Sequence, residues 1–257
     1  MQIDSPQKNS SLGASSMRAA RIRRRVLDIS MAAQTSHIGS SLSCIEILEA
    51  ALSKTGFDLN SPTNEFVLSK GHAAPALYSA LAEHGYLNVS DLEHYATPGS
   101  KLEEHPNHFI PYVPTPSGSL GHGLAFGAGF VLAGMRDETF RQATVVMSDG
   151  ECNEGTVWEA AIFAGSRTLT NLTVIIDSNS WQATGRTAET FGSLRIGNLF
   201  HSAGWEVKEV DGHNLEELTE ALDRPLDSPG KPLCIVASTV KGKGVSFMED
   251  DNNWHYR

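Results

Sequence analysis

The chain has 257 residues, of which 40% are hydrophobic and 19% are charged, a globular composition that suits one large domain or two small ones. Its net charge of −10 repels phosphodiester backbones, so the composition argues against nucleic acid as a partner. The sequence contains no apolar run approaching the ~20 residues that cross a bilayer, and its N-terminus lacks the apolar core of a signal peptide, so we expect no membrane insertion.

The first predicted elements are a loose arm and a basic helix. Residues 1–16 are rich in Ser, Gln and Asn and offer little to bury, so we expect a flexible N-terminal arm. Helical periodicity then covers residues 17–33, with Ile22, Val26 and Ile29 on one face. This basic amphipathic segment resembles a mitochondrial presequence. We interpret it instead as a first surface helix whose basic face is solvated.

Helices and strands alternate along the rest of the chain. After a loop at QTSHIGSSLS, in which Ser43 or its neighbours can cap the next helix, the predicted helices are CIEILEAAL, AAPALYSALAEHGY, GLAFGAGFVLAGM, TVWEAAIFAGSRTL and LEELTEAL. The predicted strands are NEFVL, ATVVM, LTVIID, WEVKEVDG and PLCIVASTV. This alternation predicts an α/β fold with a mostly parallel sheet and helices on both faces. We take residues 17–257 as one domain.

The three cysteines, Cys44, Cys152 and Cys234, show no metal-binding or redox spacing. An odd, sparse set is typical of a reducing compartment, and we expect a cytoplasmic protein. Cys152 lies among acidic residues that raise the pKa of a thiol, so we interpret it as unreactive.

Two polar residues follow two successive predicted strands. Asp149 comes just after ATVVM, and Asn179 lies 30 residues later, just after LTVIID. One βαβ unit fits this separation and can bring both strand ends to the same edge of the sheet, where ligands of such sheets bind. A carboxylate and an amide oxygen there suit a hard cation such as Mg²⁺ or Ca²⁺, and Gly150 lets a phosphate approach the backbone. Either residue alone is more often an ordinary turn residue, but the pair favours a metal–diphosphate site.

The segment SDGECNEGTVWEAAIFAGSRTLTNLTVIIDSN carries this pair, and it resembles the thiamine diphosphate motif in the form found in the transketolase family. In that family the aspartate, the asparagine and a backbone carbonyl shortly after it bind the divalent ion. The resemblance therefore implies Asp149, Asn179 and the carbonyl of Trp181 as metal ligands, with thiamine diphosphate and Mg²⁺ or Ca²⁺ as cofactors. Ser148 departs from the motif, which usually has Gly at that position.

Four histidine-containing segments resemble the same family. TSHIGSSLS and EEHPNH resemble loops whose histidines face the substrate, which implies that His37 and His105 act on the sugar. FVLSKGHAAPALY and TVKGKGVSFMEDDNNWH resemble loops whose histidines lie near the diphosphate, which implies His72 and His255. Histidine titrates near neutral pH, as proton transfers on sugars require.

The resemblance covers approximately residues 17–255. SGSLGHG resembles the loop whose backbone contacts the aminopyrimidine ring of the cofactor, at Gly118 and Leu120. The cofactor-binding residues that the resemblance implies are His72, Gly118, Leu120, Asp149, Gly150, Glu151, Glu154, Asn179 and His255.

The resemblance also implies a partner. Transketolases carry a pyrimidine-binding domain and a C-terminal domain after this one, and the glutamate that activates the aminopyrimidine ring lies in the pyrimidine-binding domain. Glu154 matches a different family glutamate, which couples sites across the dimer. We therefore expect the N-terminal subunit of a split transketolase, working with a separate C-terminal subunit in an α2β2 assembly. The reaction would move a two-carbon ketol unit from a ketose, usually phosphorylated, to an aldose.

Two alternatives stay open. The α subunit of a 2-oxo acid dehydrogenase E1 component shares the cofactor motif and the assembly, but it should lack the histidine loops in this order. A non-catalytic binding subunit descended from such an enzyme is the other. The intact Asp149, Asn179 and His105 argue against such a loss of the catalytic site.

Overall fold

The computed structural model describes residues 6–55, 63–224 and 230–256. Its centre is a five-stranded sheet in the order β1-β2-β3-β5-β4, with every neighbouring pair parallel. The strands are β1 (Asn64–Leu68), β2 (Gln142–Ser148), β3 (Leu172–Ser178), β4 (Glu206–Asp211) and β5 (Leu233–Ser238). The predicted α/β class and parallel sheet are confirmed.

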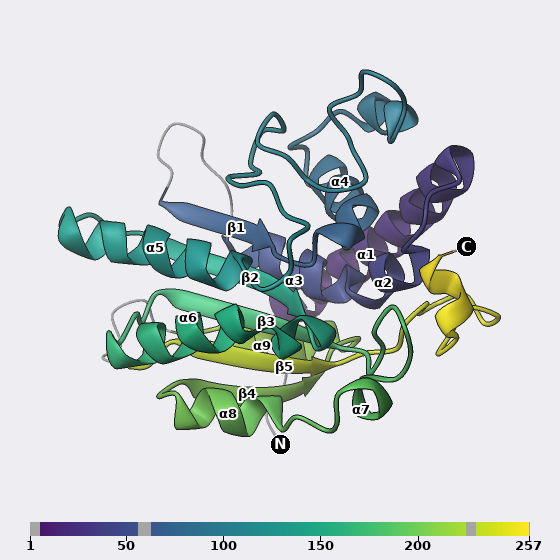
Figure 1. The fold of residues 1–257 in the computed structure, drawn as a ribbon. Coiled ribbons are helices and arrows are strands. Elements are labelled where there is room, and N and C mark those ends of the chain that lie inside the picture. The colour runs from purple at the N-terminus through teal and green to yellow at the C-terminus, as the bar shows by residue number, and fades with distance from the viewer. Residues whose placement is uncertain (1–5, 56–62, 225–229, 257) are drawn as a thin grey trace.

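Helices cover both faces of the sheet (Figure 1). One layer contains α1, α3, α4 and α9, and the other contains α5, α6 and α8. The helices are α1 (Pro6–Ala33), α2 (Ile38–Ser43), α3 (Ile45–Thr55), α4 (Ala74–Glu83), α5 (Gly123–Arg136), α6 (Gly155–Ser166), α7 (Thr187–Thr190), α8 (Ile196–Ser202) and α9 (Leu215–Leu222). No helix in these described ranges is long and apolar enough to cross a membrane.

The inner strands β2, β3 and β5 are largely apolar because both of their faces are covered, whereas the edge strand β4 carries charged residues and stays partly exposed. Val145 and Met147 of β2 pack with the layer of α5 and α6, whereas Val146 between them packs with the layer of α1 and α4. Side chains alternate along a strand, so a strand buried on both sides reads as a continuous apolar run. That pattern is why the short run ATVVM marks a central strand.

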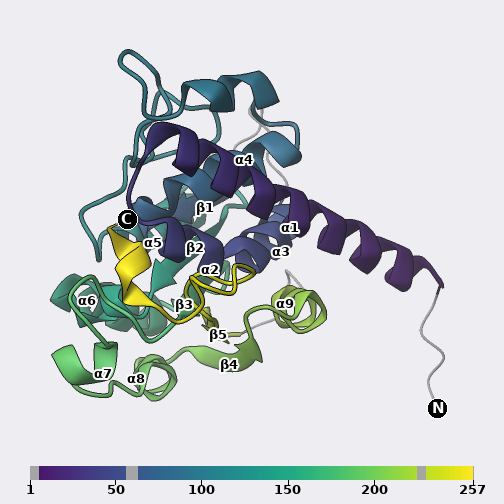
Figure 2. The ribbon, with the colours of Figure 1, turned by 90° about the vertical axis from the view of Figure 1, so that its right-hand side faces the viewer.

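Helix α1 differs from its prediction at both its start and its charged face. It begins at Pro6 rather than at residue 17, so most of the expected arm is helical. Figure 2 shows the N-terminal half of α1 projecting beyond the other elements, where polar residues need no core. Ile22, Val26 and Ile29 are buried as predicted. The solvated basic face is wrong in part, because several arginines pair with buried or partly buried glutamates: Arg18 with Glu49, Arg23 with Glu46, and Arg21 and Arg25 with Glu83.

Three further short helices were not predicted. The segment expected as a loop after α1 forms α2, and α7 and α8 lie between β3 and β4. Ser43 ends α2 instead of capping α3, and its hydroxyl donates to the Asp177 carboxylate at 2.6 Å. Runs this short carry too few residues for a period of 3.6 to be read.

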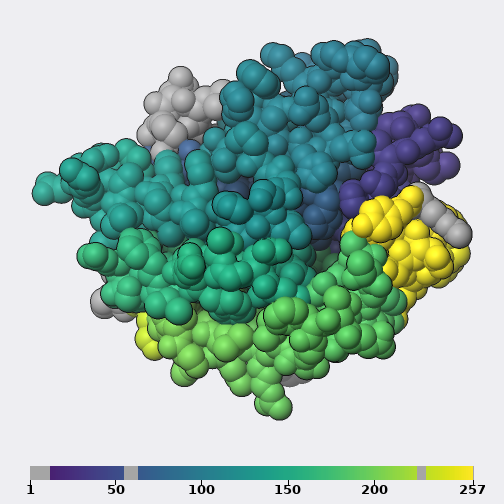
Figure 3. Space-filling model, in the orientation of Figure 1, coloured from purple at the N-terminus to yellow at the C-terminus, as the bar shows by residue number. Residues whose placement is uncertain are grey.

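Parallel strands place all their carboxyl ends at one edge of the sheet. In Figure 1 the strands point to the right, and α2, α7 and the yellow C-terminal segment lie beyond their tips. Figure 3 shows α5 and α6 side by side on the surface of the same view. The edge beyond the strand tips is where the candidate site lies.

Candidate active site

Four histidines from distant segments meet beyond the strand tips. The ring centroids of His37 and His255 are 4.7 Å apart, and those of His37 and His72 are 5.5 Å apart. His105 lies 6.4 Å from His37, and His72 lies 6.3 Å from His255. The sequence prediction named each of these residues, and the fold brings them into one cluster.

His37 sits at the centre of the cluster in a strained backbone conformation. Its φ of 67° lies in the left-handed region, which non-glycine residues adopt at a cost that the surrounding structure must outweigh. Its backbone N–H donates to the carbonyl of His255 at 2.7 Å. Among the described residues its buried Nδ1 has no hydrogen-bonding partner. Burial, with His105 nearby, lowers the pKa of His37 to about 4, so the ring is neutral near pH 7.

His255 is held by a lysine that the sequence prediction did not name. Lys241 Nζ donates to His255 Nδ1 at 2.7 Å and to Asn252 Oδ1 at 2.7 Å. Because the ammonium group can only donate, His255 accepts at Nδ1 and carries its proton on Nε2. Burial, and then the charge of Lys241, lowers the pKa of His255 to about 3. Burial also lowers the pKa of Lys241, to about 8, which still leaves it charged at neutral pH.

His105 packs against the glycine loop that precedes α5. A Cβ added to Gly118 would lie 3.0 Å from His105 Cδ2, and the φ of Gly118 is 146°. Both the close approach and the backbone angle require glycine. The loop of Gly118 and Leu120 therefore borders the histidine cluster through its backbone.

Asp149 is the buried carboxylate of this edge. It is 4% exposed, and its Oδ2 accepts from the Ser180 N–H at 3.0 Å and from Thr187 Oγ1 at 2.9 Å. Its buried Oδ1 has no hydrogen-bonding partner in the described ranges. Burial raises the pKa of Asp149 to about 6, with the Asp177 carboxylate adding to the effect. A buried carboxylate with a free oxygen is costly by itself and is stabilised by a cation.

Asn179 and Trp181 lie directly beside Asp149, at the tip of the neighbouring strand. The Asn179 amide group donates to Asp177 Oδ2 at 3.3 Å, and its Oδ1 accepts from the Trp181 N–H at 3.0 Å. Trp181 and Arg186 face each other as a non-hydrogen-bonded antiparallel pair. In such a pair the N–H and C=O groups of both residues point away from the opposite strand, so the Trp181 carbonyl does not bond to Arg186. An amide oxygen, a carbonyl and the free carboxylate oxygen thus belong to one short stretch of this edge. The donor set fits a hard divalent cation.

A fully buried ion pair lies beneath these groups. Lys70 follows β1 and bonds to Asp177 Oδ2, and both side chains are 0% exposed. Burial by itself lowers the pKa of Lys70, but Asp177, with smaller contributions from Cys44 and Asp149, raises the pKa above its usual value. Asp177 also accepts from Ser43 and Thr239. The pair therefore joins the ends of β1, β3 and β5 under the site.

The remaining predicted residues occupy different positions. Glu151 is 0% exposed, and its carboxylate accepts from Ser69, from the Gly121 N–H at 2.7 Å and from the Ser148 N–H at 3.3 Å. It holds the glycine loop in place, and direct contact with a cofactor stays a prediction. Glu154 is exposed at the start of α6. Gly150 lies beside Gln182: a Cβ added to Gly150 would lie 3.0 Å from Gln182 Cγ.

Lys70 and Lys241 are the site residues that the sequence analysis missed. Each follows a strand of the sheet, β1 and β5 respectively. The rule that ligands bind at strand ends could have found them, because both lie in segments that follow predicted strands, SKGH and TVKGKG. Two buried lysines give this edge local positive charge within an acidic protein.

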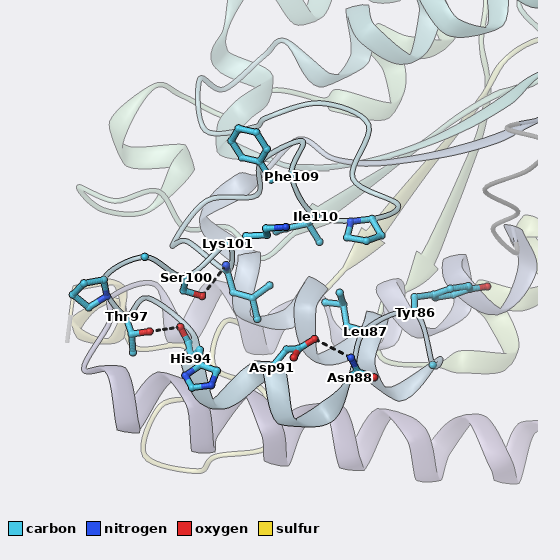
Figure 4. Close-up of a pocket in the computed structure, with 15 residues that line it drawn as sticks. Tyr86, Leu87, Asn88, Asp91, His94, Thr97, Ser100, Lys101, Phe109 and Ile110 are labelled. Atoms are coloured by element: carbon cyan, nitrogen blue, oxygen red, sulfur yellow. Dashed lines mark hydrogen bonds between the residues drawn. The ribbon is translucent and has the colours of Figure 1, made fainter.

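Other candidate features lie apart from this edge. The three cysteines are free and buried, and burial raises the pKa of Cys152 well above its usual value, in agreement with the unreactive interpretation. No group of three or more His, Cys, Asp and Glu side chains in the described part of the chain is arranged to hold a metal ion. A cavity of about 600 Å³ is lined by residues such as Tyr86, His94, Lys101 and Phe109 (Figure 4) and contains none of the predicted site residues.

The sequence of the chain matches one family model and several known proteins, and all of them carry the name transketolase. Residues 15–256 match the family model described as "Transketolase, thiamine diphosphate binding domain". The chain is 34% identical over 244 residues to an apulose-4-phosphate transketolase subunit of Phocaeicola vulgatus, covering 91% of this chain and 85% of that protein. It is 37% identical over 219 residues to a 6-deoxy-6-sulfo-D-fructose transketolase subunit of a Clostridium species, covering 83% of this chain and 80% of that protein.

Solved structures agree with these relatives. The transketolase of Campylobacter jejuni superimposes with a TM-score of 0.85 at 28% identity, covering 93% of this chain and 39% of that one. The Pichia stipitis transketolase in complex with sedoheptulose-7-phosphate gives a TM-score of 0.87 at 28% identity, covering 94% of this chain and 38% of that one. The chain therefore spans less than half the length of the solved transketolases that it matches.

Proposed function

The chain belongs to the transketolase family, and from that premise we propose that it is the N-terminal, thiamine diphosphate-binding subunit of a split transketolase. With a separate C-terminal subunit it transfers a two-carbon ketol unit from a ketose, phosphorylated in the usual case, to an aldose. Two relatives of similar length support this assignment because both are named as transketolase subunits. The observation that carries it is the buried Asp149 oxygen without a partner, beside Asn179 and four clustered histidines.

The divalent ion, Mg²⁺ or Ca²⁺, belongs at Asp149 in this proposal. Its ligands are the free Oδ1 of Asp149, Oδ1 of Asn179 and the carbonyl of Trp181. Asp149 has the one buried carboxylate oxygen without a partner among the described residues, so a cation there removes an existing cost. The Asn179 amide is already oriented, because its nitrogen donates to Asp177.

The diphosphate belongs between the ion and the two loops that carry His72 and His255. Lys241 supplies the charge there, and the His255 ring is a neutral donor through Nε2–H, because Lys241 occupies Nδ1. Gly150 opens a 3-10 turn (Gly150–Asn153) directly after Asp149, and its lack of a side chain lets a phosphate approach the backbone there. When bound, thiamine diphosphate supplies the nucleophilic carbon and the electron sink of the reaction.

His37 and His105 act on the sugar in this proposal. His37 is neutral near pH 7, since its pKa is lowered to about 4, and its Nδ1 is free. A neutral imidazole can accept a hydroxyl proton or hold a hydroxyl in place. His105 borders the same space from the glycine-loop side and offers a second polar group.

The partner subunit docks on the exposed face of α5 and α6 in this proposal. Both helices expose large apolar side chains: Phe126 of α5 is 38% exposed, and Ile162 and Phe163 of α6 are 60% and 39% exposed. Exposed apolar groups clustered on neighbouring helices mark interaction surfaces. Glu154 opens α6 at the site end of this face, consistent with coupling between subunits. An α2β2 assembly and a cytoplasmic location are parts of the same proposal, the latter resting on three free cysteines.

Reconstitution tests the proposed function. The chain is copurified with the protein that binds it in its own cells, and ketol transfer is measured with thiamine diphosphate, Mg²⁺ and a panel of phosphorylated ketoses and aldoses. We expect activity with the partner and none from the chain alone. Oxidative decarboxylation of a 2-oxo acid by the same complex would instead establish the dehydrogenase alternative. Activity from the chain alone would contradict the need for a partner glutamate.

A further inference from the structure

Three side chains tie together the two loops that flank the proposed diphosphate site. Asp250 accepts a bidentate pair of hydrogen bonds from Arg186, at 2.7 Å and 2.6 Å, and a third bond from Trp181 Nε1 at 2.8 Å. The Arg186 guanidinium lies 3.8 Å from the centroid of the Trp181 ring. We call Trp181, Arg186 and Asp250 the loop clamp.

The first loop of the clamp is a hairpin that rests on Asp149. Residues 180–187 are closed by the Thr187 N–H to Ser180 carbonyl bond at 3.0 Å and the Gln182 N–H to Gly185 carbonyl bond at 2.8 Å. Both ends of the hairpin bond to the same Asp149 oxygen, through the Ser180 N–H and Thr187 Oγ1. A movement of this hairpin therefore changes the surroundings of the proposed metal ligand directly.

The second loop carries Lys241 and His255. Asn252 connects them to the hairpin, because its Oδ1 accepts from Lys241 at 2.7 Å and its Nδ2 donates to the Ala183 carbonyl at 3.2 Å. Asp250 itself bonds through its backbone N–H to the Lys241 carbonyl at 2.8 Å. Asp250 is thus joined by its backbone to the loop of Lys241 and His255, which we call the diphosphate-side loop. Its side chain joins it to the hairpin of residues 180–187, which we call the metal-side loop.

Two residues with a strained backbone lie in or beside the loop clamp. Ser180 has a φ of 65° and Asp250 a φ of 58°, both in the left-handed region. Such conformations persist in non-glycine residues only where neighbouring contacts hold them. The clamp supplies those contacts for Asp250.

We propose that Arg186 and Asp250 are positioning residues that hold the metal-side and diphosphate-side loops closed on each other, so that Asp149, Trp181, Lys241 and His255 are preorganised for the diphosphate and its ion. This inference rests on the proposed function. Neither Arg186 nor Asp250 touches the cofactor in this proposal; both act through the loops. If the Arg186–Asp250 pair stabilises the closed loops, it strengthens the binding of the cofactor, and the bound cofactor stabilises the closed loops to the same extent.

The side chains of Arg186 and Asp250 are partly exposed, so we expect the chain to remain folded when either is substituted. The side chains of Arg186 and Asp250 are 34% and 55% exposed. A matched control exists at the opposite end of the sheet, where Arg141 pairs with Asp137 at side-chain exposures of 29% and 52%. Asp250→Asn keeps the size of the side chain, and asparagine tolerates a left-handed backbone. Asp137→Asn removes the same kind of pair away from the site.

The experiment measures amide hydrogen exchange of residues 180–187 and thiamine diphosphate binding for the full chain and for its complex with the partner. In Asp250→Asn we expect exchange in 180–187 to accelerate about fivefold without ligand, the effect of losing one favourable surface pair. The dissociation constant of thiamine diphosphate with Mg²⁺ rises between about twofold and about fivefold, and saturating cofactor restores slow exchange. Asp137→Asn changes neither quantity, and the thermal midpoint of both variants stays near that of the unmodified chain.

Each other outcome overturns one statement. Unchanged exchange in Asp250→Asn shows that the clamp does not hold the loops. Faster exchange with an unchanged dissociation constant shows that it does not serve the cofactor. Failure of the unmodified complex to bind thiamine diphosphate at all is a failure of the proposed function, and it differs visibly from the case in which the unmodified complex binds and Asp250→Asn binds equally well.

Discussion

At the scale of single residues, the site contains groups whose burial or backbone conformation costs free energy in the absence of a ligand. Asp149 is buried with a free oxygen, and His37 holds a left-handed backbone and a buried Nδ1 without a partner among the described residues. Such strain lowers the stability of the chain and is typical of functional positions. A substitution that removes such a costly group should therefore lower cofactor binding while it leaves the stability of the chain unchanged or raises it.

Substitution of Asp149 makes that separation measurable. In Asp149→Asn we expect thiamine diphosphate affinity in the presence of Mg²⁺ to fall at least about 100-fold, because a charged metal ligand is lost. The unliganded chain should unfold at the same or a higher temperature, because a costly buried carboxylate is gone. Calorimetric titration and thermal unfolding measure the two effects. A large loss of stability would show that Asp149 is structural.

The clustered histidines predict how stability depends on pH. Their pKa values are lowered in the folded chain, to about 4 for His37 and about 3 for His255, and well below the usual range for His72, chiefly by burial. Between about pH 6.5 and pH 4 the unfolded chain binds protons that the folded chain does not, so stability falls as the pH drops, by about 1.4 kcal/mol per pH unit for each such histidine. Urea unfolding at a series of pH values measures this slope.

A variant pair attributes the slope to the cluster. His255→Asn should reduce the loss of stability between pH 6.5 and pH 4, whereas substitution of the exposed His201 by Asn should leave it. An equal slope in all three proteins would contradict the assignment.

At the scale of elements, the exposed face of α5 and α6 is the surface on which we propose that the partner docks. Ile162 in α6 is 60% exposed and so contributes little to the fold of the chain. Ile162→Asp should weaken the binding of the partner by at least about 30-fold, because a charge is buried at an apolar contact. The stability of the chain alone should change by less than about 0.5 kcal/mol. Size-exclusion and titration experiments test this.

Met31 of α1 provides the control for that substitution. It is 70% exposed on the other layer of the molecule, so Met31→Asp should leave partner binding intact. Equal loss of binding in the two variants would move the docking surface away from α5 and α6.

At the scale of the whole molecule, the Lys70–Asp177 pair joins the strand ends beneath the site. Lys70→Met leaves the Asp177 carboxylate buried without its counter-charge, so we expect a loss of about 3–5 kcal/mol in the free energy of unfolding. The double variant Lys70→Met/Asp177→Asn should recover most of that loss, because no buried charge remains. Urea denaturation compares the unmodified chain, Lys70→Met and the double variant. A double variant that is as unstable as Lys70→Met, or less stable, would contradict the pairing.

Local patterns in the sequence determined the fold class and the first two site residues. Apolar runs such as ATVVM and PLCIVASTV, alternating with helical periods, predict a parallel sheet, because strands that are buried on both faces must be largely apolar. The 30-residue separation of Asp149 and Asn179 predicts their meeting, because one βαβ unit returns the chain to the same edge of the sheet. Family resemblance then named His37, His72, His105 and His255 one segment at a time.

Only the tertiary structure decided what these residues meet. The partnership of Lys70 with Asp177, of Lys241 with His255 and of Arg186 with Asp250 joins segments between 14 and 107 residues apart. No local period encodes such pairs, since they depend on how strand order and loop packing place distant segments together. The free oxygen of Asp149 is likewise a property of its surroundings. A sequence specifies which side chains exist and how each segment folds, but the charge balance and unfilled hydrogen bonds of a site arise where segments meet.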